Sequence, residues 1–142
     1  MRHWSLAVRT HARDEMLDIT TRVAHVLSGE PDGVVTVFVT HTSAGVTINE
    51  NADPDVQSDM LSWLGKLVPN DPSFEHAEGN SDAHLKATLV GSSVQVPFVG
   101  GQMLLGRWQG IYLCEFDGPR ERQLVVSLTV GGERFSGSSS QR

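Results

Sequence analysis

Apolar and polar residues alternate along short stretches at both ends of the chain, as expected for strands with one buried face. Near the start, the alternation is clear over residues 4–8 and weaker over residues 15–19. Residues 34–40 are mostly apolar and predict a buried central strand, and residues 45–49 predict the next strand. Further strands, with a hairpin turn at Gly100-Gly101, are expected at residues 93–98, 103–105, 111–116 and 123–130.

Two segments between these strands repeat apolar residues at helical spacing. The first helix is expected to begin at Thr20 or Thr21, either of which can cap it, and to stop at Gly29. The second has a stronger start, because Asp53 can cap the helix and Pro54 suits the first helical position, where its missing N–H costs nothing. A turn rich in proline then ends this helix.

A third helix is expected over residues 82–90, capped by Ser81 and closed by Gly91. The preceding stretch, residues 69–80, is irregular. Strands therefore group toward both ends of the chain, with helices inserted between them. This order predicts an α+β fold with mostly antiparallel sheets and two or three helices.

The size and composition of the chain are those of an ordinary globular protein. Its 142 residues predict one domain over residues 1–135, followed by a serine-rich, disordered tail over residues 136–142. The net charge of −6 argues against a broad nucleic-acid surface but leaves room for a small anionic ligand. No signal-peptide core or membrane-spanning run is present, and the single Cys114 cannot form an intrachain disulfide. A cytoplasmic location is therefore expected.

Histidines are the first candidates for chemistry. His41 follows the central strand and opens an unusually polar segment, His76 lies in the irregular loop, and His84 lies near the start of the third helix. Three imidazoles from such places can converge on one divalent metal with an open coordination position. The alternative is that each is a surface histidine without a common partner. The other three histidines are interpreted as surface residues: His3, His11 and His25.

Amide and carboxylate side chains follow the second strand, at Asn49, Glu50, Asn51 and Asp53. Turn and capping chemistry explains Asp53. It explains the three preceding residues less well, because one helix start does not need so many polar side chains. Glu50 is therefore a candidate general acid or base, or a carboxylate ligand for magnesium.

Two later motifs offer ligand contacts. In Gly106-Arg-Trp-Gln-Gly110, Trp108 can stack on a small ring and Gln109 can donate and accept hydrogen bonds; the alternative is a packed, half-buried Trp at a strand kink. In Asp117-Gly-Pro-Arg120, a rigid loop can fix the Arg120 guanidinium for phosphate; the alternative is a surface turn with an Arg–Asp pair. Cys114 is interpreted as a small core residue, and no serine occupies a Gly-x-Ser-x-Gly nucleophile elbow.

Together these motifs resemble one family, the YjbQ-like proteins, often described as secondary thiamine-phosphate synthase enzymes. The matching motifs lie in order between Trp4 and Val130 and comprise His41-Thr-Ser-Ala44, Asn49-Glu-Asn-x-Asp53-Pro-Asp-Val56, His76, Gly79-Asn-Ser-Asp-Ala-His84, Leu105-Gly-x-Trp-Gln109 and Glu115-Phe-Asp-Gly-Pro-Arg120. Arg107 departs from the pattern, which has a small hydroxyl residue there. The resemblance implies a YjbQ-like α+β fold with its sheets in a sandwich or half-barrel. It also implies a homotrimer with the motif residues in a polar pocket near a subunit boundary.

The resemblance further implies a thiamine-phosphate synthase activity, in which hydroxymethylpyrimidine diphosphate joins a thiazole phosphate and pyrophosphate leaves. The catalytic candidates are then His41, Glu50, His76 and His84. The candidates for substrate binding are Asn49, Asn51, Trp108, Gln109 and Arg120, with the helix start at Ser81-Asp82 as a further anion contact. The candidate ligands of a divalent metal, zinc or magnesium, are His41, His76 and His84.

The expected partner is a small phosphorylated metabolite, with neither nucleic acid nor membrane involved. Two alternatives stay open: a metal-dependent hydrolase, and a non-catalytic module that binds a phosphorylated metabolite.

Overall fold

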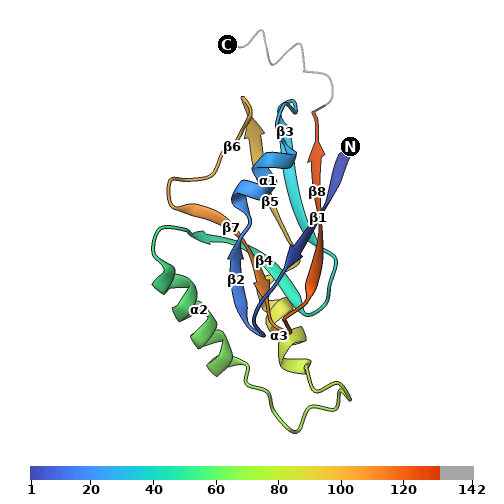
Figure 1. Ribbon diagram of the computed structural model, residues 1–142, viewed down its shortest axis with the longest axis vertical. Helices are drawn as coiled ribbons and strands as arrows, with labels where there is room; N and C mark the ends of the chain where they lie inside the picture. The colour runs from blue at the N-terminus through green and yellow to red at the C-terminus, as the bar shows by residue number, and fades with distance from the viewer. Residues whose placement is uncertain (132–142) are drawn as a thin grey trace, which may run out of the picture.

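The computed structural model describes residues 1–131, which form two antiparallel sheets and three helices (Figure 1). The larger sheet has five strands in the order β1-β8-β3-β5-β6. Their bounds are β1 (Arg2–Arg9), β8 (Glu121–Thr129), β3 (Gly33–Val39), β5 (Ser93–Val99) and β6 (Gln102–Met103). The turn between β5 and β6 uses Gly100 and Gly101, both at positive φ (62° and 80°), as the glycine pair predicts.

The smaller sheet has three strands in the order β2-β7-β4: β2 (Glu15–Asp18), β7 (Gln109–Glu115) and β4 (Ala44–Glu50). At one end of β4, Ala44 lies opposite Glu115; at the other end, Glu50 lies opposite Gln109. Six residues of extended chain separate these ends by about 20 Å. This register decides which of the motif residues can meet within one subunit.

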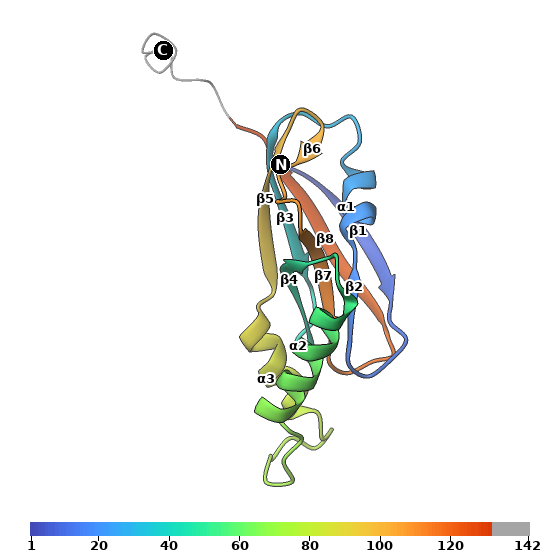
Figure 2. The ribbon, with the colours of Figure 1, turned by 90° about the vertical axis from the view of Figure 1, so that its left-hand side faces the viewer.

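The main core lies between the two sheets. Alternate residues of β3 and β8 point inward, and Val35, Val37, Leu124, Val126 and Leu128 are all completely buried. The helix α1 (Thr20–Val26) covers one end of this core, with Val23 buried in it. In the side view of Figure 2, α1 lies beside β1 at the upper end of the molecule.

The helices α2 (Pro54–Leu67) and α3 (Ser81–Val90) cover the other face of the smaller sheet. A second core forms where Ala83 and Ala87 of α3 pack on the β7 side chains of Tyr112 and Cys114. Within residues 1–131, no side chain of α2 is fully buried. Both helices lie at the lower end of the molecule in Figure 2.

The predicted α+β architecture with mostly antiparallel sheets is confirmed, and so is the start of α2. The Asp53 side chain accepts a hydrogen bond from the Asp55 N–H at 2.9 Å, and Pro54 is the first helical residue. The expected tail, residues 136–142, lies outside the described residues. Among the helices of residues 1–131, none is long and apolar enough to cross a membrane.

The predicted caps of the other two helices are wrong. Ile19 precedes α1, and the Thr20 hydroxyl instead donates to Asp18 at 2.6 Å and accepts from the Ile111 N–H at 2.8 Å. Asn80, not Ser81, precedes α3, and its side chain turns away from the helix to reach Asp117. In both cases a tertiary hydrogen bond has replaced the local capping bond.

Candidate functional site

A polar cavity of about 440 Å³ opens at the end of the molecule where β3 ends and β4 begins. Three loops and the start of α3 form it, namely the β3–β4 connection, the loop before α3 and the β7–β8 connection. We call it the polar pocket; its lining residues are Thr40, His41, Thr42, Ser43, His76, Glu78, Asn80, His84, Asp117, Arg120 and Arg122. His41, His76, His84 and Arg120, which lie up to 79 positions apart in the sequence, therefore share one cavity.

His41 is fixed by a hydrogen bond to strand β8, which lies beside β3. Its Nε2 accepts a hydrogen bond from the Gln123 backbone N–H at 2.8 Å, so the imidazole extends the β3–β8 ladder beyond Val39. A nitrogen that accepts from an amide carries no proton, so the neutral ring holds its proton on Nδ1. Burial lowers the pKa of His41, and the nearby Arg122 and Arg120 lower it further against an opposing effect of Glu115. His41 is thus held as a neutral N–H donor.

A buried ion pair supports the floor of the polar pocket. Arg122 and Glu115 are 3% and 0% exposed, and the guanidinium contacts the carboxylate through both Nε (2.7 Å to Oε2) and Nη2. The Nη2 group also donates to the Ser43 hydroxyl at 3.0 Å, and the Thr10 hydroxyl donates to Glu115 at 2.9 Å. This satisfied network holds the Ser43 loop against β7 and β8.

Sequence reasoning missed this pair, although a signal for it exists. Arg122 falls on the same alternating positions as Leu124 and Val126, and Glu115 on the same positions as Leu113. A charged residue at an inward position of a strand is buried, and a buried charge needs a partner.

Arg120 sits at the rim of the polar pocket and is oriented by Asp117. Its Nε donates to the Asp117 carbonyl at 2.7 Å and its Nη2 to the Asp117 carboxylate at 2.9 Å. The same carboxylate oxygen accepts from the Asn80 amide at 2.7 Å. The Arg–Asp turn predicted as the ordinary alternative is therefore present, and it coexists with an Arg side chain that lines the cavity.

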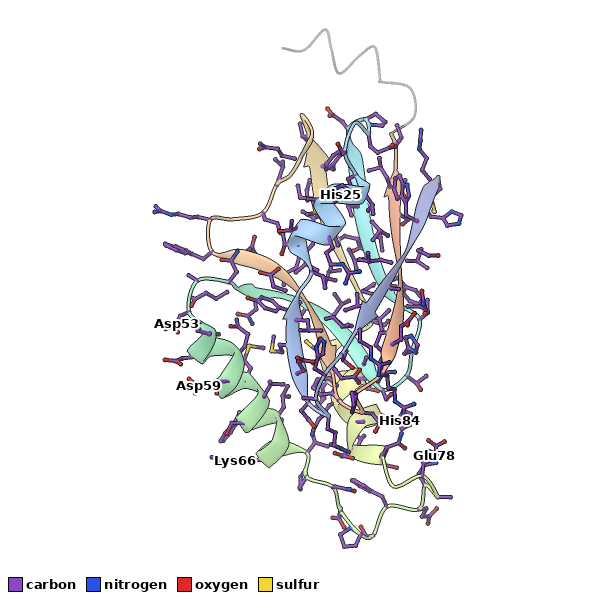
Figure 3. All side chains as sticks on the ribbon, viewed as in Figure 1. His25, Asp53, Asp59, Lys66, Glu78 and His84 are labelled. Carbon is purple, nitrogen blue, oxygen red and sulfur yellow. The ribbon has the colours of Figure 1, made fainter. Side chains whose placement is uncertain are left out.

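The other two histidines of the polar pocket lie close together. The His76 and His84 rings meet edge to face, with centroids 5.5 Å apart. His84 Nδ1 lies 2.9 Å from the Thr42 carbonyl oxygen, to which it must donate, so the neutral ring keeps a free lone pair on Nε2. His76 Nε2 lies 3.7 Å from the Glu78 carboxylate. Figure 3 labels Glu78 and His84 at the lower right of the molecule.

These contacts fit poorly with a metal held by all three imidazoles. A metal needs a lone pair on each ligand, and the one on His41 Nε2 is already used by the Gln123 N–H. Among the described residues, no three His, Cys, Asp or Glu side chains are grouped closely enough to hold an ion. The divalent metal stays a prediction, for which His76 and His84 are the better candidates.

The remaining predicted residues lie at the opposite end of β4. We call them the far-end group: Asn49, Glu50, Asn51, Trp108 and Gln109. The Asn51 N–H donates to the Trp108 carbonyl at 2.9 Å, and Glu50 pairs with Gln109 in the sheet. Figure 3 labels Asp53, just after this group, at the left of the molecule, away from His84. Within one subunit the predicted residues therefore form two groups about 20 Å apart, not one.

Part of the far-end group has structural contacts of its own. The Asn49 amide donates to the Met60 sulfur at 3.3 Å and its Oδ1 accepts from the Glu50 N–H at 2.7 Å, which ties β4 to α2. Trp108 is about half-buried (55% exposed), as the alternative interpretation expects, and the Arg107 guanidinium lies over its ring at 4.8 Å. The residue that departs from the family pattern thus stacks on the proposed ligand platform.

At the start of α3, where an anion contact is expected, the Asp82 side chain does not line the polar pocket. Asp82 is buried outside the polar pocket, where it pairs with Arg13 at 3.0 Å and with Lys86 at 3.5 Å. Burial acts to raise the pKa of Asp82, but the hydrogen bond and charge of Arg13, with the charge of Lys86, outweigh it and lower the pKa. The first turn of α3 therefore already has its own carboxylate.

A family model and several known proteins match this chain over most of its length. The family model described as UPF0047 protein YjbQ-like matches residues 4–131. The UPF0047 protein YugU of Bacillus subtilis is 46% identical over 127 residues, covering 87% of this chain and 96% of that relative. A UPF0047 protein of Methanocaldococcus jannaschii is 46% identical over 123 residues, covering 85% and 89%.

Solved structures match as well. A YjbQ/UPF0047-family protein from Clostridium acetobutylicum superposes with a TM-score of 0.85 at 48% identity, covering 89% of this chain and 99% of that one. A protein from Aeropyrum pernix superposes with a TM-score of 0.86 at 37% identity, covering 91% and 98%. Both similarities extend over nearly the whole of the described residues.

Proposed function

This chain belongs to the YjbQ-like UPF0047 family, and on that premise we propose that it is an enzyme acting on a small phosphorylated metabolite in the polar pocket. The proposed reaction is of the thiamine-phosphate synthase type that the motif resemblance implies. Hydroxymethylpyrimidine diphosphate would react with a thiazole phosphate and release pyrophosphate.

The observation that carries this proposal is the pair of fixed donors in the polar pocket. His41 offers Nδ1–H because its Nε2 is engaged by the Gln123 backbone. Arg120 uses Nε and Nη2 on Asp117, and within residues 1–131 its Nη1 makes no hydrogen bond. A guanidinium held in place by a carboxylate and an imidazole held in one tautomer are preorganised to receive phosphate oxygens.

These donors suit the difficult step of the proposed reaction. The C–O bond between the pyrimidine methylene and the diphosphate breaks, a C–N bond to the thiazole nitrogen forms, and negative charge builds on the departing pyrophosphate. Arg120 and His41 would stabilise that charge. His84, with a free Nε2, and His76 beside it would exchange protons with the leaving group.

A homotrimer is part of the proposal, as the family resemblance implies. Several exposed apolar side chains support association, among them Phe38 on β3 (44% exposed) and Trp63 on α2 (64% exposed). In such an assembly, the far-end group of one subunit would approach the polar pocket of its neighbour. Glu50, Asn51, Trp108 and Gln109 would then contact substrate across the boundary.

The test is to measure pyrophosphate release with each substrate alone and with both together. Release only with both substrates is the expected result, and Arg120→Ala should lower the rate at least tenfold. Arg9→Ala, which removes an exposed Arg of β1 outside the polar pocket, is the matched control and should leave the rate unchanged.

Other outcomes identify the rival functions. Phosphate release from one substrate that a chelator abolishes would indicate a metal-dependent hydrolase. Stabilisation by the substrates without any product would indicate a binding module. Either result would overturn the synthase proposal.

A further inference from the structure

A second cavity of about 330 Å³ adjoins the polar pocket and differs from it in character. The two cavities share His41 and Thr42. The remaining residues that line the second cavity are small: Ala44, Ala87, Thr88, Gly91 and Ser92. Apart from His41, no lining side chain can carry a charge. We call this cavity the neutral pocket.

Part of the wall of the neutral pocket is backbone that hydrogen bonds from β3 and β4 hold in place. The Ser92 carbonyl accepts from the Val39 N–H at 2.8 Å, and the Gly91 carbonyl accepts from the Val46 N–H at 3.0 Å. The end of α3 thereby lies close against β4, where a side chain on Gly45 would meet the Gly91 oxygen at 2.7 Å. Gly91 itself has φ of 102°, a conformation that favours glycine. The backbone around Gly91 and Ser92 is therefore fixed, and this side of the cavity is preformed.

His41 lies at the junction of the two cavities. On one side of His41 lie Arg120 and Arg122; on the other lie a methyl group, hydroxyl groups and glycine. A ligand that fills both cavities must be charged at one end and neutral at the other. Small uncharged lining groups suit the flat face of a single ring, with Thr88 and Ser92 available to its polar edge atoms.

We propose that the neutral pocket is a ring subsite, which receives the uncharged ring of a phosphate ester while the phosphate lies in the polar pocket. This inference rests on the proposed function for its phosphate half. The ring would lie against α3 and the start of β4 of the same subunit, and its binding would not require Trp108. The substrate class is thus a phosphate or diphosphate ester of a single-ring alcohol.

The experiment compares two probes, inorganic phosphate and benzyl phosphate, by calorimetric titration of the full chain. The wild-type protein should bind benzyl phosphate at least tenfold more tightly than phosphate, because only the ester reaches the neutral pocket. Thr88→Phe should remove that advantage and leave the affinity for phosphate unchanged. Thr88 is exposed, and its hydroxyl bonds only to its own helix, at the His84 carbonyl.

Leu89→Phe is the matched control, since it adds an aromatic ring to the next residue of α3, which is 60% exposed and outside both cavities. It should keep the tenfold difference. Ser92→Phe fills the neutral pocket from the opposite wall and replaces Thr88→Phe if that variant fails to fold.

The outcomes separate this inference from the proposed function. Equal affinities of the wild-type protein for both probes, or unchanged benzyl phosphate binding in a folded filling variant, would overturn the ring subsite alone. If phosphate does not bind at all, or Arg120→Ala does not weaken it, both the phosphate site and the subsite that depends on it fail.

Discussion

At the scale of single residues, the Arg122–Glu115 pair is the contact on which the polar pocket depends most. Both groups are almost fully buried, so removing one leaves the other as an unpaired charge. Glu115→Gln should therefore lower the free energy of unfolding by about 3–5 kcal/mol. Urea denaturation at a fixed protein concentration measures this change.

Arg120→Ala is the control for that prediction, because it breaks an Arg–carboxylate pair on an exposed surface. The Arg120 side chain is 50% exposed, and such pairs contribute about 1 kcal/mol or less. Similar losses of stability in Glu115→Gln and Arg120→Ala would contradict the view that the buried pair organises the site.

His41 predicts a dependence of stability on pH. Its pKa in the folded protein is lower than the ordinary value of 6.5, because burial and two arginines disfavour its charged form. On acidification, the unfolded chain therefore takes up this proton before the folded chain does, which favours unfolding. The free energy of unfolding should fall as the pH decreases from about 6.5 through the lower folded pKa.

His41→Gln should reduce this slope, since the amide cannot titrate and its oxygen can still accept from the Gln123 N–H. Above pH 7 the difference in stability between wild type and variant should not change with pH. Parallel curves for wild type and His41→Gln below pH 6.5 would show that His41 does not supply the effect.

At the scale of elements, α2 packs on the second core through partly buried side chains such as Leu61 and Leu64. Within residues 1–131 none of its side chains is fully buried, so its stability depends on local terms such as the Asp53 cap. Asp53→Ala should cost about 1 kcal/mol, which corresponds to amide hydrogen exchange about fivefold faster in α2. Exchange in β3 and β8 should not change, because the main core does not include the cap.

Asp59→Ala is the matched control, an exposed carboxylate in the middle of the same helix (Figure 3). It should leave the exchange rates of α2 within twofold of wild type. Faster exchange in both variants would point to a general effect of lost negative charge. Unchanged exchange in Asp53→Ala would mean that tertiary contacts, not the cap, hold α2.

Much of the secondary structure follows from patterns that act locally. Alternation identifies β1 and β5 because one face of each is buried, and the apolar run over residues 34–40 identifies β3. The Asp53-Pro54 pair marks the start of α2 because capping needs only neighbours in the chain. The caps of α1 and α3 escape such reasoning. Thr20 and Asn80 bond to Ile111 and Asp117, partners about 90 and about 40 positions away, which no local pattern encodes.

At the scale of the whole molecule, sequence reasoning expects three histidines, Arg120 and Trp108 to share one hollow, because the motif resemblance groups them. The polar pocket contains the histidines and Arg120 but not Trp108. It does not predict that the far-end group lies elsewhere. His41 and Glu50 bound one continuous polar segment, yet most of that segment is strand β4, and an extended strand carries its two ends apart. Residues that are close in the sequence are therefore far apart in space, and only the pairing of β4 with β7 shows this separation.

The proposed homotrimer gives this separation a testable consequence. If each site combines the polar pocket of one subunit with Trp108 of the next, Arg120→Ala and Trp108→Ala disable different halves of it. Each variant alone should lose most of the synthase activity, while Trp108→Ala should still bind benzyl phosphate normally. Oligomers re-formed from an equal mixture should recover about a quarter of the wild-type activity, because that fraction of boundaries joins two intact halves.

Light scattering should first give a mass three times the 15.5 kDa of the chain. The control mixture combines Arg120→Ala with His41→Ala, whose lost groups belong to the same pocket. A re-formed boundary cannot restore that pocket, because each contributing subunit lacks one of its two donors, so this mixture should stay inactive. If activity recovers in neither mixture, the reaction takes place within one subunit. The far-end group would then have only the structural role that its contacts to α2 already give it.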